Sequence, residues 1–550
     1  MRSIPADPPA SGRWQQAAPF LIAAVLLTLV LGALWLRIME RCSGVFTYGL
    51  DDPYIHLSLA RTLAQHGVWG VTPYATADCV SSIAWPLLLA AIFRVAGPQE
   101  LAPLLLNFLA ALVLLAFVDA LLRRRLMTGG ARLMVMLGVI ILTPLPALVF
   151  GGMEHILHAL ALLWLLVAAA RTLADDTDRP GARWRLALAA LLAVSVRYES
   201  MAAVAVVVVL ALLRGRWRTG LVVALLPAAL LALRAALAID AGWWWLPASV
   251  LMKGTAAEFS AAQLTELSWR FATRVAMMPL VIIMGGAAAL GLHLHRREGN
   301  TRWRETPLLL VMLMCCLLAQ FLFSRTGSLY RYEAYLYALG LPIIALGLRI
   351  RGQEVLGFML VCLLLPWQDR GVAGLQTVEY ACGNIRQQQR VMGEFLRDHF
   401  TGATVVANDI GMITWLADIH LVDLAGLASR EVAAAAMRGE WTCATFARVA
   451  QHADIALVYD SWYIMAGGLP PSWRRQLVWQ MHDNVVCGSE YVSFYAVAPA
   501  AEARLRTALA GFDPPNAELL ERAVPLDTFS AVSYGTDYRG GAIPVHGGEE

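Results

Sequence analysis

Two adjacent carboxylates, Asp51 and Asp52, follow the first long apolar segment of the chain and precede Pro53 and Tyr54. Carboxylates so close together perturb each other's pKa, and ionisable side chains beside an apolar segment of membrane-spanning length are candidates for function. Asp52 before Pro53 is also the pattern expected at the N-cap and first position of a helix. We therefore expect a catalytic pair in which Asp52 caps that helix. Asp51 is then the candidate general base, which would take a proton from an attacking hydroxyl.

Other ionisable residues lie where further apolar segments end: Glu154, His155, Arg197, Glu199, Lys253, Arg325 and Arg331. The basic members of this set can bind a lipid phosphate, which arginine contacts with two hydrogen bonds and lysine as a point charge. The alternative is internal ion pairing, for example between Arg197 and Glu199 or Glu154. Ionisable groups at the depth of a membrane are functional candidates by default.

The composition predicts a membrane protein. Hydrophobic residues make up 59% of the 550 residues and charged residues only 15%, against about 25% charged in a soluble protein. The formal net charge of +3 gives no indication of a nucleic-acid partner. The apolar run 17–36 is longer than the roughly 7–15 apolar residues of a signal peptide. We therefore expect it to be a first membrane helix, with the N-terminus in the cytoplasm.

Apolar segments of spanning length predict about eleven membrane helices. Arg197 and Glu199 interrupt the apolar stretch 186–213, which we therefore predict to be two short helices, 184–197 and 200–213. The other spans are predicted at 17–36, 101–122, 131–150, 153–173, 218–239, 275–294, 307–323, 333–348 and 353–367.

Arginine clusters set the expected orientation. With the N-terminus inside, the arginine-rich loops near 123–132, 171–185, 214–218, 296–304 and 349–351 all face the cytoplasm, as the positive-inside rule requires. This holds only if 83–96 does not span. Its length of about 21 Å falls short of the roughly 30 Å hydrocarbon core, so we predict a re-entrant or interfacial helix. The first outer loop (38–100), a second one (240–273) and the C-terminal region then face the outside.

The predicted architecture is a transmembrane domain over 1–367 and an extracytoplasmic α/β domain over 368–550. Strands are predicted at 403–407, 420–424, 455–459 and 492–497, with a helix between the first two. Cys42 and Cys79 share the first outer loop, where an oxidising compartment permits a disulfide, and the sequence leaves both states open. The chain has no phosphate-binding glycine-rich loop, no HExxH and no paired CxxC motif. Nothing in it therefore indicates a bound nucleotide donor.

Six motifs occur in order along the chain, and a seventh lies in the C-terminal region. They are Asp51-Asp52-Pro53-Tyr54-Ile55, Ala60-Arg61-Thr62-Leu63-Ala64 with Gly67, Ser81-Ser82-Ile83-Ala84-Trp85-Pro86, Gly152-Met153-Glu154, Arg197-Tyr198-Glu199-Ser200, Leu246-Pro247-Ala248-Ser249-Val250-Leu251-Met252-Lys253 and Asn408-Asp409-Ile410-Gly411. In these motifs the chain resembles the GT-C superfamily of membrane glycosyltransferases, which use polyprenyl-phosphate sugars. It looks most like the branch of bacterial terminal cell-wall arabinofuranosyltransferases. The hinge lacks that family's proline and glycine, and Ala248 replaces its asparagine.

The resemblance implies an inverting transfer of a sugar from a polyprenyl-phosphate donor to a hydroxyl of a cell-envelope glycan or glycolipid, on the outer face of a bacterial inner membrane. Asp51 would deprotonate the acceptor hydroxyl. The lipid phosphate would be held by Lys253, Arg197, Arg325 or Arg331. Tyr54, Glu154, His155 and Glu199 would bind or orient the sugar. No cofactor is required, although Asp51 with Asp52 could hold a divalent metal.

Two other functions fit part of the sequence. A transporter or flippase of lipid-linked sugars would explain the interrupted helices, which occur in transporters. A non-catalytic assembly partner of a glycosyltransferase would keep the fold without using Asp51. Replacing Asp51 with asparagine distinguishes both from an enzyme. The substitution should stop glycan transfer by an enzyme, but it should spare lipid movement by a transporter and leave the cell-surface glycan unchanged for an assembly partner.

Overall fold

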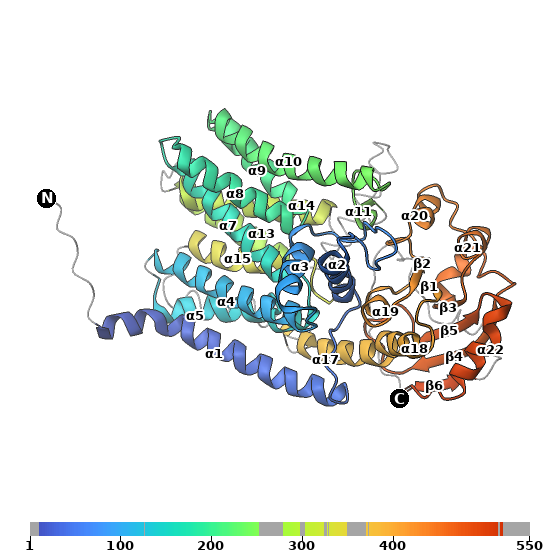
Figure 1. Ribbon diagram of the computed structural model, residues 1–550. Coiled ribbons are helices and arrows are strands. Elements are labelled where there is room, and N and C mark those ends of the chain that lie inside the picture. Colours follow the sequence, from blue (N-terminus) through green and yellow to red (C-terminus); the bar gives the residue numbers. More distant parts are fainter. Residues whose placement is uncertain are drawn as a thin grey trace.

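A computed structural model of the chain describes residues 10–125, 127–251, 279–297, 303–323, 327, 329–348, 370–371, 373–514 and 517–520. Figure 1 shows a region of long helices beside a smaller domain built on a β-sheet, with α2, α18 and α19 at their junction. The predicted fold class, a helical membrane protein with a C-terminal α/β domain, is confirmed.

Among the described residues, five helices are long and apolar enough to cross a membrane: α1 (Ala10–Arg41), α4 (Ala102–Arg123), α7 (His155–Ala174), α10 (Trp217–Asp240) and α14 (Glu305–Phe323). Large apolar side chains such as Leu29, Leu105 and Leu233 are exposed on these helices. Exposed apolar surface on this scale indicates contact with lipid rather than water.

Other helices occupy most of the remaining predicted spans. They are α5 (Gly129–Leu142), α6 (Leu145–Gly151), α8 (Pro180–Val196), α9 (Ser200–Leu213), α13 (Pro279–Arg297) and α15 (Ala334–Gly347). The predicted span 131–150 is interrupted at Thr143–Pro144, because proline removes a helical hydrogen bond. The predicted span 353–367 lies outside the described residues.

The predicted hinge between two short helices is confirmed. Helix α8 ends at Val196, Arg197 is extended with φ −152° and ψ 137°, and α9 begins at Ser200. The break places the side chain of Arg197 beside Glu154 and His155 at the start of α7 and pairs it with Glu199. Residues 83–96 also form the short helix that the sequence predicted, α3 (Ala84–Ala96).

The helix after the paired carboxylates, α2 (Asp52–His66), begins one residue earlier than predicted. Asp52 is its first residue, and Asp51 occupies the N-cap position without a side-chain bond to α2 among the described contacts. The prediction that Asp52 caps this helix is therefore wrong. The carboxylate of Asp51 instead binds a helix of the C-terminal domain.

The C-terminal domain contains a six-stranded sheet in the order β2-β1-β3-β5-β4-β6 among the described residues. The strands are β1 (Thr404–Ala407), β2 (His420–Asp423), β3 (Ile455–Val458), β4 (Arg474–Met481), β5 (Tyr491–Ala496) and β6 (Ala517–Leu520). β1 pairs in parallel with β2 and β3, and the remaining pairs are antiparallel. The four predicted strands are all present. β4 was missed because it begins with two arginines and a glutamine, and β6 was missed because only its pairing with β4 makes it a strand of the sheet.

Helices flank this sheet: α18 (Val391–His399), α19 (Gly411–Leu416), α20 (Arg430–Met437), α21 (Cys443–Val449) and α22 (Glu502–Leu509). α17 (Ala373–Ile385) continues into α18 through the π-helical turn Arg386–Arg390. Val378, Ala381 and Cys382 of α17 pack in the core of the helical region, whereas the core of the sheet domain begins at Val391. One continuous helical segment thus joins the two regions.

Cys42 and Cys79, for which the sequence left a disulfide open, are both buried free thiols.

Candidate functional site

Asp51 joins the first outer loop to the C-terminal domain. The backbone N–H of Gly411 donates to Oδ2 of Asp51 at 2.7 Å, and the N–H of Met412 donates to Oδ1 at 2.8 Å. Both N–H groups belong to the first turn of α19, where they have no partner within the helix. A β-carbon at position 411 would overlap the backbone carbonyl oxygen of Asp51 and lie 2.8 Å from Oδ2. Glycine is therefore needed for this close approach.

A second half-buried carboxylate, Asp409, lies in the same junction. Its Oδ2 accepts hydrogen bonds from the Gln389 side-chain amide at 2.7 Å and from the Tyr459 hydroxyl at 2.6 Å. Burial raises the pKa of Asp51, and the negative charge of Asp409 raises it further, which outweighs the two N–H groups that lower it. Burial also raises the pKa of Asp409. The pKa of Asp51 is therefore closer to neutral pH than that of an ordinary carboxyl.

Asp52 points in a different direction, toward the helical region. Its Oδ2 lies 2.5 Å from a guanidinium nitrogen of Arg331, which precedes α15. The Asp52 side chain is one-third exposed, whereas that of Arg331 is buried. The loop thus carries a half-buried carboxyl and, one residue later, a carboxylate paired with a buried cation.

His56 lies one helical turn after Asp52 and extends the site toward α7. It is buried, and its Nε2 is 3.9 Å from Oε2 of Glu154, which directly precedes α7. His56 Nδ1, Glu154 Oε2 and His155 Nδ1 are buried polar atoms that have no hydrogen-bond partner among the described residues. Such atoms in one place indicate a site that binds water or a polar ligand.

Arg197 forms the internal ion pairs that the sequence left open as an alternative. Its guanidinium lies 2.6 Å from Glu154, 2.5 Å from Glu199 and 3.1 Å from Nε2 of His155. The hinge thus brings together four of the predicted site residues. Two carboxylates already compensate the charge of Arg197, so they compete with any phosphate for it.

Tyr54 is fully buried, and its ring packs edge-on against that of Tyr48. Its hydroxyl donates to Glu100 Oε1 at 2.9 Å and accepts from the backbone N–H of Tyr48 at 3.1 Å. Glu100 in turn pairs with Arg390, at the end of the π-helical turn, at 2.8 Å. Tyr54 therefore fixes the shape of the segment that carries Asp51.

Lys253 and Arg325 lie outside the described residues. Within the described ranges, no group of three or more His, Cys, Asp or Glu side chains is placed to hold a metal ion.

Sequence reasoning did not assign a role to His56 or Asp409. The spacing of His56 from Asp52 on one helix could have indicated the first, whereas only the fold brings Asp409 to Asp51.

A family model described as "Domain of unknown function (DUF8728)" matches residues 383–495, which is part of the C-terminal domain. No curated protein matches the chain at a significant level.

Three solved structures of two proteins match most of the chain. ArnT from Cupriavidus metallidurans bound to undecaprenyl phosphate is 13% identical with a TM-score of 0.51, and the match covers 86% of this chain and 98% of that one. The same protein in the apo state gives 13% identity and a TM-score of 0.51, with 87% and 99% covered. The oligosaccharyltransferase AglB from Archaeoglobus fulgidus is 12% identical, with 93% and 76% covered and a TM-score of 0.46.

The likeness to ArnT concerns the fold and extends over most of both chains. The protein therefore has the fold of the GT-C membrane enzymes. At this identity the comparison establishes the fold, and the chemistry has to be argued from the site.

Proposed function

We propose that this protein is a membrane glycosyltransferase that moves a sugar from a polyprenyl-phosphate donor to a hydroxyl of a glycan or glycolipid. The observation that carries the proposal is the arrangement of the first outer loop, in which Asp51, with its raised pKa, stands beside an Asp52–Arg331 ion pair. The GT-C fold supports it, because one similar structure contains undecaprenyl phosphate.

In the proposed reaction, Asp51 takes the proton of the acceptor hydroxyl. The hydroxyl oxygen then attacks the anomeric carbon of the sugar with its electron pair. The bond from that carbon to the phosphate oxygen breaks, the phosphate leaves with the electron pair, and the configuration inverts. A base works best when its pKa lies near the operating pH, which the buried position of Asp51 favours. The N–H groups of Gly411 and Met412 hold its carboxylate in one orientation.

The leaving phosphate needs positive charge as the bond breaks. Arg331 is the described residue best placed for this, because it is buried and bound to a partly exposed carboxylate. Fixed cations aimed at developing charge are a large part of catalysis. Lys253 and Arg325 are proposed to contribute, as the sequence motifs suggest. Arg197 is proposed to position Glu154 and Glu199 rather than to bind phosphate alone.

The sugar is proposed to lie against Glu154, His155 and His56, whose unpaired polar atoms can bond hydroxyl groups. By motif resemblance, we propose a pentofuranose sugar and a cell-envelope acceptor. By the same resemblance, we propose a position in a bacterial inner membrane. The arginine-rich loops support an orientation with the N-terminus in the cytoplasm and the C-terminal domain outside.

The test is transfer of radiolabelled sugar from a panel of polyprenyl-phosphate monosaccharides by the purified full-length protein in detergent. We expect wild type to move label to an acceptor or to water, and Asp51→Asn to lower the rate about 10²–10⁴-fold. Size-exclusion and thermal-melting measurements check that the variant is folded.

A parallel measurement follows movement of labelled lipid-linked sugar across reconstituted vesicles. Lipid movement that persists in Asp51→Asn, with no sugar transfer by wild type from any donor, would favour the transporter alternative. Neither activity in a folded protein would favour an assembly partner.

A further inference from the structure

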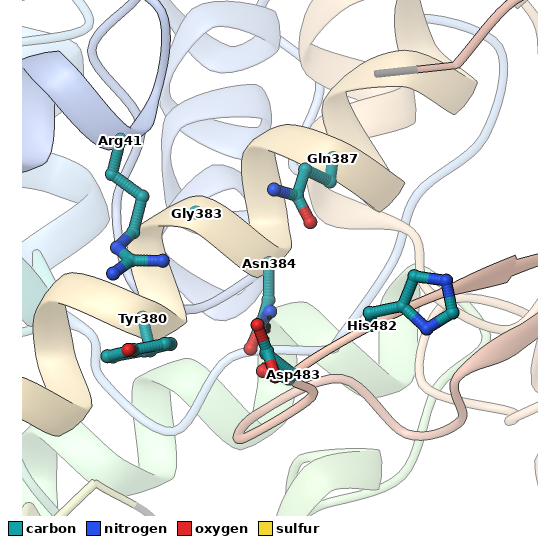
Figure 2. A pocket seen from close by; sticks show the side chains of 7 residues that line it. All are labelled: Arg41, Tyr380, Gly383, Asn384, Gln387, His482 and Asp483. Atoms are coloured by element: carbon teal, nitrogen blue, oxygen red, sulfur yellow. Dashed lines mark hydrogen bonds between the residues drawn. The ribbon is translucent and has the colours of Figure 1, made fainter. Parts of the chain in front are cut away.

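A polar pocket opens where the first membrane helix meets the C-terminal domain. It has a volume of about 420 Å³ and is lined by Arg41, Tyr380, Gly383, Asn384, Gln387, His482 and Asp483. Figure 2 shows these side chains arranged around one space, with Arg41 and Tyr380 on one side and His482 on the other. Three segments far apart in sequence supply them. The volume is within the roughly 300–1,000 Å³ of small-molecule sites.

Contacts of Asn384 and Arg41 hold the segments that line the pocket in place. Asn384 donates from Nδ2 to the carbonyl of Asp483 at 3.0 Å and accepts from the N–H of Val485 at 2.8 Å, so it ties the loop after β4 to α17. Arg41 lies 3.7 Å over the ring of Tyr380 and donates to Glu379 at 3.1 Å.

Glycine at position 383 permits this packing of Arg41. A β-carbon there would lie 2.8 Å from Cδ and 2.9 Å from Cγ of Arg41. The side chain of Arg41 therefore rests directly on the backbone of α17 and forms one wall of the pocket.

Three lining side chains have unused hydrogen-bonding groups. Gln387, His482 and Asp483 make no side-chain hydrogen bond or ion pair with any residue that the structure describes. Gln387 and His482 can each donate and accept, and Asp483 can accept. Gln387 lines the pocket from the π-helical turn, and His482 and Asp483 line it from the loop after β4.

The charges decide which ligand fits. An anion would face the unpaired carboxylate of Asp483, and Glu379 already compensates Arg41. A cation would face Arg41, with Arg37 also 3.6 Å from Glu379. An alkyl chain would find no aliphatic side chain among the lining residues. A neutral ligand whose groups both donate and accept satisfies all three free side chains, and sugar hydroxyls are such groups.

The position of the pocket agrees with this chemistry. Arg41 is the last residue of α1 and of its membrane-spanning segment. The pocket therefore opens at the membrane surface, where the sugars of a glycolipid lie. Next to Gln387, the side chains of Gln388 and Gln389 form hydrogen bonds with the Tyr459 hydroxyl at 2.6 and 2.9 Å. The same hydroxyl contacts Asp409. The π-helical turn that carries these glutamines is of a kind often found at functional sites.

We propose that this pocket is a saccharide-binding site that holds a sugar unit of the acceptor at a distance from the reacting hydroxyl. The saccharide chemistry is inferred from the pocket alone, and its role for the acceptor rests on the proposed function. A long glycan bound here would have its other end free to reach the outer loop that carries Asp51.

The test is binding of neutral oligosaccharides of two to four units, namely arabinan, galactan, mannan and chitin fragments, to the full-length protein in detergent without donor. Inorganic phosphate and phosphoethanolamine serve as anionic probes. We expect at least one oligosaccharide to bind and the double variant Gln387→Ala, His482→Ala to weaken it about tenfold or more, as loss of two hydrogen bonds implies. Gly383→Ala, which displaces Arg41, should also weaken it.

The matched control is Gln451→Ala with His452→Ala, an exposed pair outside the lining residues, which should leave affinity unchanged. No oligosaccharide binding, binding that the pocket variants do not alter, or preferential binding of the anionic probes would overturn the proposal. Because no donor is present, oligosaccharide binding by a protein without transferase activity would retain the site and reject the proposed function. Transfer without such binding would do the reverse.

Discussion

The Asp51 carboxylate accepts a 2.7 Å hydrogen bond from the backbone N–H of Gly411, a residue 360 positions further along the chain. This bond connects the first outer loop with α19 of the sheet domain. The orientation of the candidate base is therefore set by a domain that lies outside the membrane helices. The C-terminal domain is thus part of the candidate site.

Gly411→Ala should lower transfer about a hundredfold without removing any catalytic group. The added methyl would overlap the backbone oxygen of Asp51 and press on its carboxylate, and a displacement near 1 Å can cost about 10²-fold. The measurement is kcat for sugar transfer. Gly511→Ala, where a β-carbon meets nothing within 4 Å, is the control and should retain wild-type kcat. Equal activity in both variants would show that the contact does not position Asp51.

The rate of transfer should rise with pH through an ionisation well above the usual carboxyl range. Burial and Asp409 raise the pKa of Asp51, and a base acts only when it is deprotonated, so activity is lost as pH falls through that raised pKa. Asp409→Asn removes one negative charge and should shift the pH profile to lower pH. Asp513→Asn, an exposed substitution in the same domain, should leave it in place. A profile that Asp409→Asn does not move would contradict the assigned cause.

Removing the cation beside Asp52 should slow the chemical step. Arg331→Gln should lower kcat about 10²–10³-fold, the loss typical for one group that stabilises transition-state charge. Arg397→Gln removes an arginine from an exposed pair with Asp398 and should have no effect. If KM for the donor rose while kcat stayed constant, Arg331 would bind the donor without favouring the transition state.

Glu154→Gln should destabilise the folded protein by about 3–5 kcal/mol, because it leaves the buried Arg197 with an incomplete set of partners. Thermal unfolding in detergent measures the change. Glu440→Gln breaks an ion pair with Arg438 of similar length, 2.8 Å, whose side chains are more than half exposed, and should cause no measurable loss. Equal melting temperatures for the two variants would show that the hinge cluster does not hold the helices together.

The sequence predicted most helices because their signals are local. Long apolar runs located the spans, and the Arg197–Glu199 interruption located the hinge between α8 and α9. Strands β1, β2, β3 and β5 were predicted for the same reason, since each is a short apolar run. β4 and β6 were not, because their membership of the sheet depends on pairing with β5 and with each other.

The site was predictable in its residues but not in its contacts. The motifs indicated Asp51 and Asp52, but the sequence placed Asp52 at the N-cap position, which Asp51 occupies in the structure. Asp52 begins α2 and pairs with Arg331, whereas Asp51 binds α19. At the beginning of a helix, two neighbouring side chains point in different directions. Which of them finds a partner depends on the residues that the tertiary fold places nearby.

The sequence by itself determined that the chain is a membrane protein, where its helices break and which loop carries paired carboxylates, because hydrophobicity and charge act over a few neighbouring residues. Only the tertiary structure decided that α19 holds Asp51, that Asp409 raises its pKa and that α1, α17 and the loop after β4 enclose a polar pocket. Each of these depends on residues hundreds of positions apart, which come together only when burial and backbone pairing have fixed the fold.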